Sequence, residues 1–105
     1  MDPSRNIRVL VADDHPLMVA GIVGEINAQA DMTVSALAAD GEEALSLYRT
    51  HRPDVTIMDV RMPKLNGIDA ITAIRKEFPR ARIIVLTTAI GDVQALRALD
   101  RKSVV

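Results

Sequence analysis

The sequence predicts an α/β domain in which helices pack on the faces of a parallel β-sheet. Its 105 residues are about the length of one domain. Four short apolar runs alternate with four segments of helical spacing, and only a few residues join them. Most of the runs are apolar at successive positions, which is typical of strands that are covered on both faces. This alternation indicates parallel strands joined by right-handed crossovers.

The four expected strands are the short apolar runs. They span Ile7–Ala12, Thr33–Leu37, Val55–Met58 and Ile83–Thr88. Arg8 interrupts the first run, and the second run is the least regular of the four. Even so, each run has the length of a strand rather than of a helix.

The four expected helices repeat apolar residues every three or four positions, which is the spacing of one helix face. Their apolar positions lie, in chain order, within Val19–Ile26, Ala44–Tyr48, Ile68–Phe78 and Val93–Leu99. Pro16 precedes the first, where the first turn of a helix tolerates proline. Glu42 and Glu43 precede the second, and acidic residues favour a helix N-terminus. Pro79 follows the third, and Gly91-Asp92 provides a cap for the fourth.

The composition excludes several classes of protein. The net charge is −1, from 13 Lys and Arg against 14 Asp and Glu, which argues against a basic nucleic-acid or membrane binder. The absence of Cys excludes disulfides, thiolate metal sites and cysteine nucleophiles. The apolar runs are far too short to span a membrane, and the polar N-terminus does not resemble a signal peptide. We therefore expect a cytoplasmic domain with an aliphatic core.

Acidic and hydroxyl side chains follow three of the expected strands. Asp13 and Asp14 come after the first, Asp59 after the third, and Thr87 and Thr88 end the fourth. In open α/β sheets, ligands bind beyond the carboxyl ends of the strands. If the first and third strands are neighbours, three carboxylates converge there and repel one another unless a cation offsets them. Mg²⁺ suits such oxygen ligands and leaves room for phosphate oxygens.

Taken singly, each of these residues has a simpler interpretation. An acidic pair such as Asp13-Asp14 is usually a solvated turn or helix cap, and Asp59 alone is an ordinary strand-end acid. Thr87 alone suits a core strand. His15 stands before a proline at a helix start and is expected to be solvated rather than a ligand. His51 lies at a helix end, where a cation suits the dipole. Only their combination on one sheet edge favours a functional site.

The loop after Asp59 is the remaining candidate for chemistry. Asn66-Gly67 predicts a turn there, and backbone carbonyls of this loop could complete a metal site. The chain contains no glycine-rich dinucleotide or P-loop motif, and no nucleophile elbow of a serine hydrolase.

With these features, the sequence resembles the receiver domain of bacterial two-component response regulators over roughly residues 7–99. The residues that carry the resemblance are Val9–Leu17, Ala39–Leu45, Arg52–Pro63 with Asn66-Gly67, and Ile83–Thr88. The Asp-Asp-His-Pro run at residues 13–16 resembles the subfamily that has a C-terminal helix-turn-helix DNA-binding domain. The resemblance implies a flavodoxin-like three-layer sandwich with a parallel sheet of order 2-1-3-4.

The resemblance also implies a role for each site residue. Asp59 would be the phosphoacceptor. Asp13, Asp14 and Asp59 would hold Mg²⁺, Asp14 directly and Asp13 mainly through water. The backbone carbonyl of Arg61 would be a further metal ligand, and Thr87 would be the switch hydroxyl that turns toward the phosphoryl group.

The function implied is a phosphoryl-accepting switch rather than a conventional enzyme. A sensor histidine kinase would be the partner, and the output would be transcriptional regulation. The chemistry agrees, because a carboxylate can attack phosphorus and form an acyl phosphate, and phosphoryl transfer depends mostly on positioning and charge neutralisation. One alternative is a phosphorylation-impaired interaction or dimerisation module of the same fold. Another is a Mg²⁺-dependent phosphohydrolase, which is disfavoured because Arg61 stands where such enzymes carry an acid/base Asp.

The resemblance fades after Leu99. The family continues with a small-residue turn, a fifth strand that ends in a lysine, and a fifth helix, and Lys102 comes too early to be that lysine. We therefore expect a receiver domain over residues 1–105 that is truncated after about residue 99, with weakened phosphorylation or readout. An uncovered edge at Ile83–Thr88 would favour a homodimer or domain swap. We expect no direct nucleic-acid binding and no membrane association.

Overall fold

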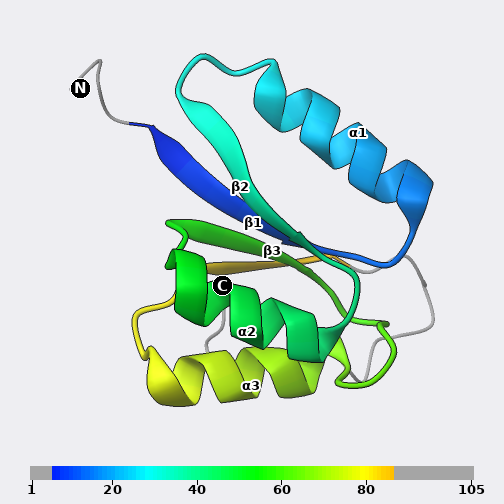
Figure 1. Ribbon diagram of the computed structural model, residues 1–105, viewed down its shortest axis with the longest axis vertical. Coiled ribbons are helices and arrows are strands. Elements are labelled where there is room, and N and C mark those ends of the chain that lie inside the picture. Colours follow the sequence, from blue (N-terminus) through cyan, green and yellow to red (C-terminus); the bar gives the residue numbers. More distant parts are fainter. Residues whose placement is uncertain (1–5, 87–105) are drawn as a thin grey trace.

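The computed structural model describes residues 6–86, which form a parallel four-stranded sheet with helices on both faces (Figure 1). The strand order is β2-β1-β3-β4. The strands are β1 (Ile7–Ala12), β2 (Met32–Ala38), β3 (Val55–Asp59) and β4 (Ile83–Leu86). The predicted α/β fold and its strand order are therefore confirmed.

Within residues 6–86, three helices complete the layers. They are α1 (Pro16–Asn27), α2 (Gly41–His51) and α3 (Gly67–Glu77). α1 lies on one face of the sheet, and α2 and α3 lie side by side on the other (Figure 1). The helix predicted around Val93–Leu99, the predicted truncation and the residues Thr87 and Thr88 lie outside the described residues.

The burial of β1 explains its unbroken apolar run. Its last four residues have no exposed surface. Successive side chains of a strand point to opposite faces, so each face of the sheet must cover two of these four residues. Leu10 packs in the larger core, with Met58 and the α3 residue Ile74. Val11 lies in the smaller core, with Ile26 of α1. Both faces of the central strand are thus covered by apolar side chains, as the sequence predicts.

β2 is less regular because it lies at an edge of the described sheet. Its register with β1 shifts between Val9 and Leu10, and most of its residues are only half-buried. The Ser35 hydroxyl donates a hydrogen bond to the Val9 carbonyl at the irregular position. A strand paired on one side does not need the continuous apolar pattern of β1, which is why this run was the hardest to recognise.

Helices α2 and α3 begin at side-chain caps. The Asp40 carboxylate accepts the N–H of Glu43 at 2.8 Å, and Glu43 Oε1 accepts the N–H of Ala39 at 2.9 Å, which is a reciprocal cap of α2. Asn66 Oδ1 accepts the N–H of Asp69 at 2.9 Å and caps α3. Asn66-Gly67, predicted as a turn, is thus the junction between the loop and α3.

Gly67 fixes how closely α3 approaches the end of β3. A Cβ at this position would lie 2.0 Å from the Asp59 carbonyl oxygen, so only glycine fits. The Gly67 N–H also donates to the Val60 carbonyl at 2.9 Å. The start of α3 is therefore tied directly to the strand that carries Asp59.

Within residues 6–86, no helix is long and apolar enough to cross a membrane. β4 pairs with β3 on one side, and its residue Ile84 is 48% exposed. Pairing of two chains across β4 remains a prediction.

Candidate functional site

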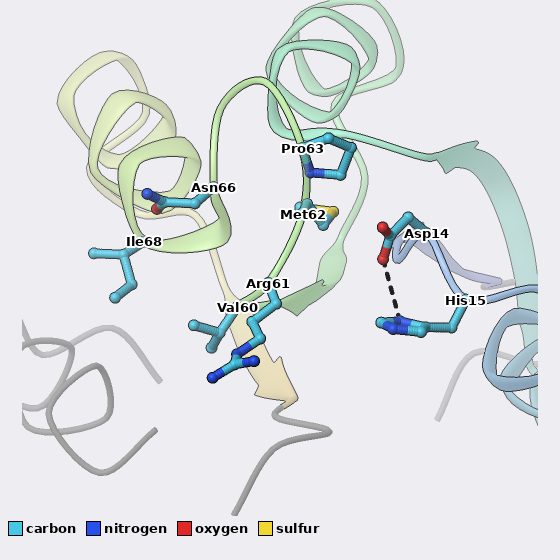
Figure 2. Close-up of a pocket in the computed structure, with 8 residues that line it drawn as sticks. All are labelled: Asp14, His15, Val60, Arg61, Met62, Pro63, Asn66 and Ile68. Carbon is cyan, nitrogen blue, oxygen red and sulfur yellow. Dashed lines mark ion pairs between the residues drawn. The ribbon is translucent and has the colours of Figure 1, made fainter. Parts of the chain in front are cut away.

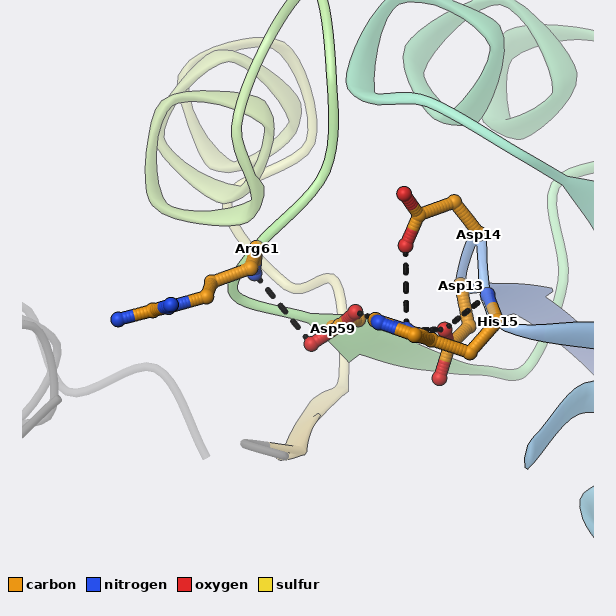
Figure 3. Close-up of polar contacts among 5 residues, drawn as sticks. All are labelled: Asp13, Asp14, His15, Asp59 and Arg61. Carbon is orange, nitrogen blue, oxygen red and sulfur yellow. Dashed lines mark hydrogen bonds and ion pairs between the residues drawn. The ribbon is translucent and has the colours of Figure 1, made fainter. Parts of the chain in front are cut away.

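The carboxyl ends of β1 and β3 bring three aspartates together (Figure 3). Ala12 lies beside Met58 in the sheet, so Asp13 and Asp59 follow at the same edge. Asp13 is 3% exposed and Asp59 is fully buried, whereas the Asp14 side chain is 35% exposed. One ligand atom of each aspartate and one of His15 all lie within 4.8 Å of one another. The predicted convergence of the three carboxylates is therefore confirmed.

Asp59 is the last residue of β3, and only one of its two carboxylate oxygens accepts a hydrogen bond. Its Oδ1 accepts the N–H of Arg61 at 3.3 Å. Its Oδ2 is buried without a hydrogen-bond partner in the described part of the chain. Burial raises the pKa of the Asp59 carboxyl, and the negative charge of Asp13 adds to this, while the Arg61 N–H opposes it.

Asp13 has the same division between its two oxygens. Its Oδ1 accepts the backbone N–H of His15 at 2.8 Å and lies 2.8 Å from the Nδ1 of the same residue. Its Oδ2 is buried and, among residues 6–86, has no hydrogen-bond partner. Two buried oxygens, one each from Asp13 and Asp59, thus lack the partners that buried polar atoms normally have.

The His15 ring lies among these carboxylates, where Figure 3 shows it between the ends of β1 and β3. Its Nδ1 is 2.8 Å from Asp13 Oδ1, 3.1 Å from Asp14 Oδ1 and 3.3 Å from Asp59 Oδ2. The hydrogen bond with Asp13 raises the pKa of the imidazole, and the charge of Asp14 adds to this, although partial burial opposes it.

The predicted exposure of His15 is confirmed, but its contact with the acidic cluster was not predicted. The ring is half-exposed, but it faces the acidic cluster rather than open water. His15 is the residue before α1, and the extended backbone at this position turns its side chain back toward Asp13. The sequence clue to this contact is that His15 directly follows two aspartates at a strand end. A histidine at a helix start is usually solvated, and this tendency favoured the simpler interpretation.

An open hollow lies beside the cluster. Its volume is about 560 Å³, and Figure 2 shows Asp14 and His15 on one side of it and the loop after β3 on the other. The loop contributes Arg61, Met62 and Pro63, and Asn66 at the start of α3 also lines it. Of the three aspartates, Asp14 lines this hollow, and Asp13 and Asp59 lie buried behind it.

The donor set fits a divalent cation. Carboxylate oxygens are the ligands that Mg²⁺ prefers, and a cation would satisfy the two buried oxygens that lack partners. Arg61, predicted to contribute its backbone carbonyl, lies on the loop that lines the same hollow. That contribution stays a prediction. Thr87, the predicted switch hydroxyl, falls outside the described residues.

Comparisons with known proteins agree with this geometry. The profile of the response regulator receiver domain matches residues 9–104. The chain is 48% identical over 82 residues to the uncharacterized transcriptional regulatory protein YxjL of Bacillus subtilis (strain 168). The aligned residues cover 78% of this chain and 38% of YxjL. The chain thus spans less than half the length of this relative.

Two solved structures show the same fold. A two-component response regulator of the LuxR family from Aurantimonas sp. SI85-9A1 is 37% identical with a TM-score of 0.81, over 90% of this chain and 68% of that one. CheY of Borrelia burgdorferi, solved as a CheX-CheY-BeF3-Mg²⁺ complex, is 30% identical with a TM-score of 0.84, over 96% of this chain and 75% of that one. On the profile match, the identity to these relatives and the shared fold, this chain belongs to the response regulator receiver domain family.

Proposed function

We propose that this chain accepts a phosphoryl group on Asp59 from a sensor histidine kinase, in a reaction that depends on Mg²⁺. The observation that carries the proposal is the buried carboxylate of Asp59. One of its oxygens is held by the Arg61 N–H, and the other lacks a hydrogen-bond partner within residues 6–86. The acidic cluster lies beside a hollow that a phosphodonor can enter.

The transfer is a substitution at phosphorus. Asp59 Oδ2 forms the new P–O bond, the P–N bond of the kinase phosphohistidine breaks, and its electron pair returns to the donor imidazole. The product is an acyl phosphate on Asp59. The Arg61 N–H holds Oδ1, so that Oδ2 remains directed toward the incoming group. The loop after β3 and Asn66 limit the direction from which the donor approaches.

Asp13, Asp14 and Asp59 would hold the Mg²⁺, with the backbone carbonyl of Arg61 as a further ligand. The bound cation neutralises charge that develops on the transferring phosphoryl oxygens. Asp13 Oδ2 and Asp59 Oδ2, which have no hydrogen bond within residues 6–86, support this assignment, because a buried polar atom without a hydrogen bond is costly. The similar CheY of Borrelia burgdorferi was solved with Mg²⁺ and BeF3.

The biological role we propose is a conformational switch for transcription, rather than an enzyme with turnover. YxjL is a transcriptional regulatory protein, and this chain aligns with only 38% of its length. We infer that phosphorylation of a receiver such as this one controls an attached helix-turn-helix domain. Thr87 would report the phosphoryl group, and pairing of two receivers, through β4 or by a domain swap, would transmit the change.

The test is intact-mass analysis after incubation with Mg²⁺ and acetyl phosphate. We expect the chain to gain the mass of one phosphoryl group, and Asp59→Asn to gain none. Asp31→Asn, which removes an equal charge on the turn before β2, serves as the matched control and should be phosphorylated like the parent chain. A folded chain that binds Mg²⁺ but gains no mass would contradict the proposal and would favour the phosphorylation-impaired interaction module.

A further inference from the structure

The inference rests on the metal site proposed above and concerns the imidazole nitrogen of His15 that faces it. His15 Nδ1 is near an oxygen of each of the three aspartates, at 2.8, 3.1 and 3.3 Å (Figure 3). Adjacent ligands around an octahedral ion with bonds of about 2.1 Å lie roughly 3 Å apart. The three distances from Nδ1 are therefore close to those between neighbouring ligands of one ion.

Apart from its hydrogen bond and ion pairs with the aspartates, the described residues give the His15 side chain no structural task. It stands at the N-cap of α1, yet within the described residues its side chain makes no capping hydrogen bond. Its ring is half-exposed, so it does not fill the core. The two buried oxygens of the same cluster, Asp13 Oδ2 and Asp59 Oδ2, are without hydrogen-bond partners in residues 6–86. Asp59 Oδ2 lies 3.3 Å from His15 Nδ1, but neither oxygen has a hydrogen bond within the described residues, and a bound cation would supply the missing partner.

An imidazole changes which cations such a cluster prefers. Carboxylates and carbonyls alone suit Mg²⁺, whereas imidazole suits Zn²⁺, Ni²⁺ and other transition-metal ions. We propose that His15 Nδ1 is a metal ligand, so that the Asp13–Asp14–His15–Asp59 cluster binds first-row transition-metal ions through nitrogen as well as oxygen, in competition with Mg²⁺. His15 is then a residue that determines metal selectivity at the phosphoacceptor site.

A direct test detects the nitrogen beside the metal. Untagged full-length chain is loaded with Mn²⁺, and electron spin-echo envelope modulation measures coupling to ¹⁴N. The chain has two histidines, and the second, His51, ends α2, away from the cluster. We expect ¹⁴N modulation from histidine in the parent chain and in the control His51→Gln, and none in His15→Phe.

A second measurement tests the selectivity. Calorimetric titrations compare Ni²⁺ with Mg²⁺ in the parent chain and in His15→Phe. We expect His15→Phe to weaken Ni²⁺ binding at least about tenfold, since even indirect partners of a metal ligand change affinity by about that factor. Mg²⁺ affinity should change by less than about threefold, because oxygen ligands hold that ion. Equal losses for both ions would overturn the inference.

The outcomes separate this inference from the function on which it rests. Mn²⁺ that binds without ¹⁴N modulation would refute the role of His15 and leave the Mg²⁺-dependent phosphoacceptor intact. A folded chain that binds neither Mg²⁺ nor Mn²⁺ would refute the metal site itself, and the role of His15 with it. Circular dichroism of His15→Phe provides the check on folding, and a spectrum equal to that of the parent chain is expected, because no capping bond is lost.

Discussion

Without a bound cation, repulsion among the three carboxylates should lower the free energy of unfolding. The Asp59→Asn variant measures by how much. The ligand atoms of the cluster lie within 4.8 Å of one another. Two unit charges at that distance repel by about 3–4 kcal/mol at an effective dielectric constant of about 20. Asp59 faces two such charges, but attraction to the His15 ring and the raised pKa of Asp59 both reduce the repulsion. We therefore expect Asp59→Asn to stabilise the cation-free chain by about 1–3 kcal/mol.

Urea unfolding followed by circular dichroism gives the free energy of unfolding. Measured in EDTA, Asp59→Asn should be more stable than the parent chain, and Asp31→Asn should lie within about 0.5 kcal/mol of it, as is usual for changes away from special features. In Mg²⁺ at about 100 times its dissociation constant, the parent chain should gain about 2.7 kcal/mol. The variant should gain less, because it has lost one ligand.

The pH dependence has a definite sign. The pKa of Asp59 is raised in the folded chain, so the folded state binds this proton more tightly than the unfolded state. In EDTA, the Asp59 contribution to stability should be most favourable below the unfolded pKa and decrease as the pH rises through the folded pKa. Asp59→Asn should remove that decrease. An Asp59→Asn variant that is neutral or destabilised in EDTA would refute the argument from charge repulsion.

Two further predictions concern residues that position the loops near the site, and a third concerns the ion pair between the C-terminal ends of α2 and α3. Gly67→Ala should destabilise the chain by more than about 3 kcal/mol in urea unfolding, because the new Cβ would lie 2.0 Å from the Asp59 carbonyl oxygen. The same variant should show reduced phosphorylation. An alanine variant of normal stability would contradict this close approach. Asp40→Ala should lower the free energy of unfolding by about 1 kcal/mol, because the cap of α2 is lost. Asp40→Asn should keep most of that stability, since asparagine also caps helices. Arg49→Met should raise the pKa of the Glu77 carboxyl, which Arg49 lowers by hydrogen bonding, and NMR titration of Glu77 checks the direction.

The fold was predictable because its main signals are local. The buried run of β1, the proline that opens α1 and the acidic first turn of α2 each specify an element within a few residues. The acidic cluster needed one further step, that β1 and β3 are neighbours, which the sheet confirms. Asp13, Asp14 and Asp59 then meet because parallel strands end at the same edge.

The direction of the His15 ring could not be predicted in this way. It depends on the backbone of one residue between β1 and α1, where φ is −99° and ψ is 108°, and on the depth of Asp13 in the sheet edge. The role of Asn66 was missed for a related reason. Asn-Gly favours a turn by its local preferences, but contact between Gly67 and the end of β3 makes this pair the start of α3.

The same contacts explain how a cluster that opposes folding can persist. Asp13 and Asp59 follow strands whose buried residues form the two cores, so the apolar packing of β1 and β3 fixes the carboxylates at short range. Gly67 and the Arg61 N–H fix the loop beyond them. The unfavourable charge is thus concentrated at one edge of the sheet, where the proposed cation and phosphoryl group would change it without disturbing the core. A receiver needs this division, because its signal is a change of charge at a site held in place by the rest of the fold.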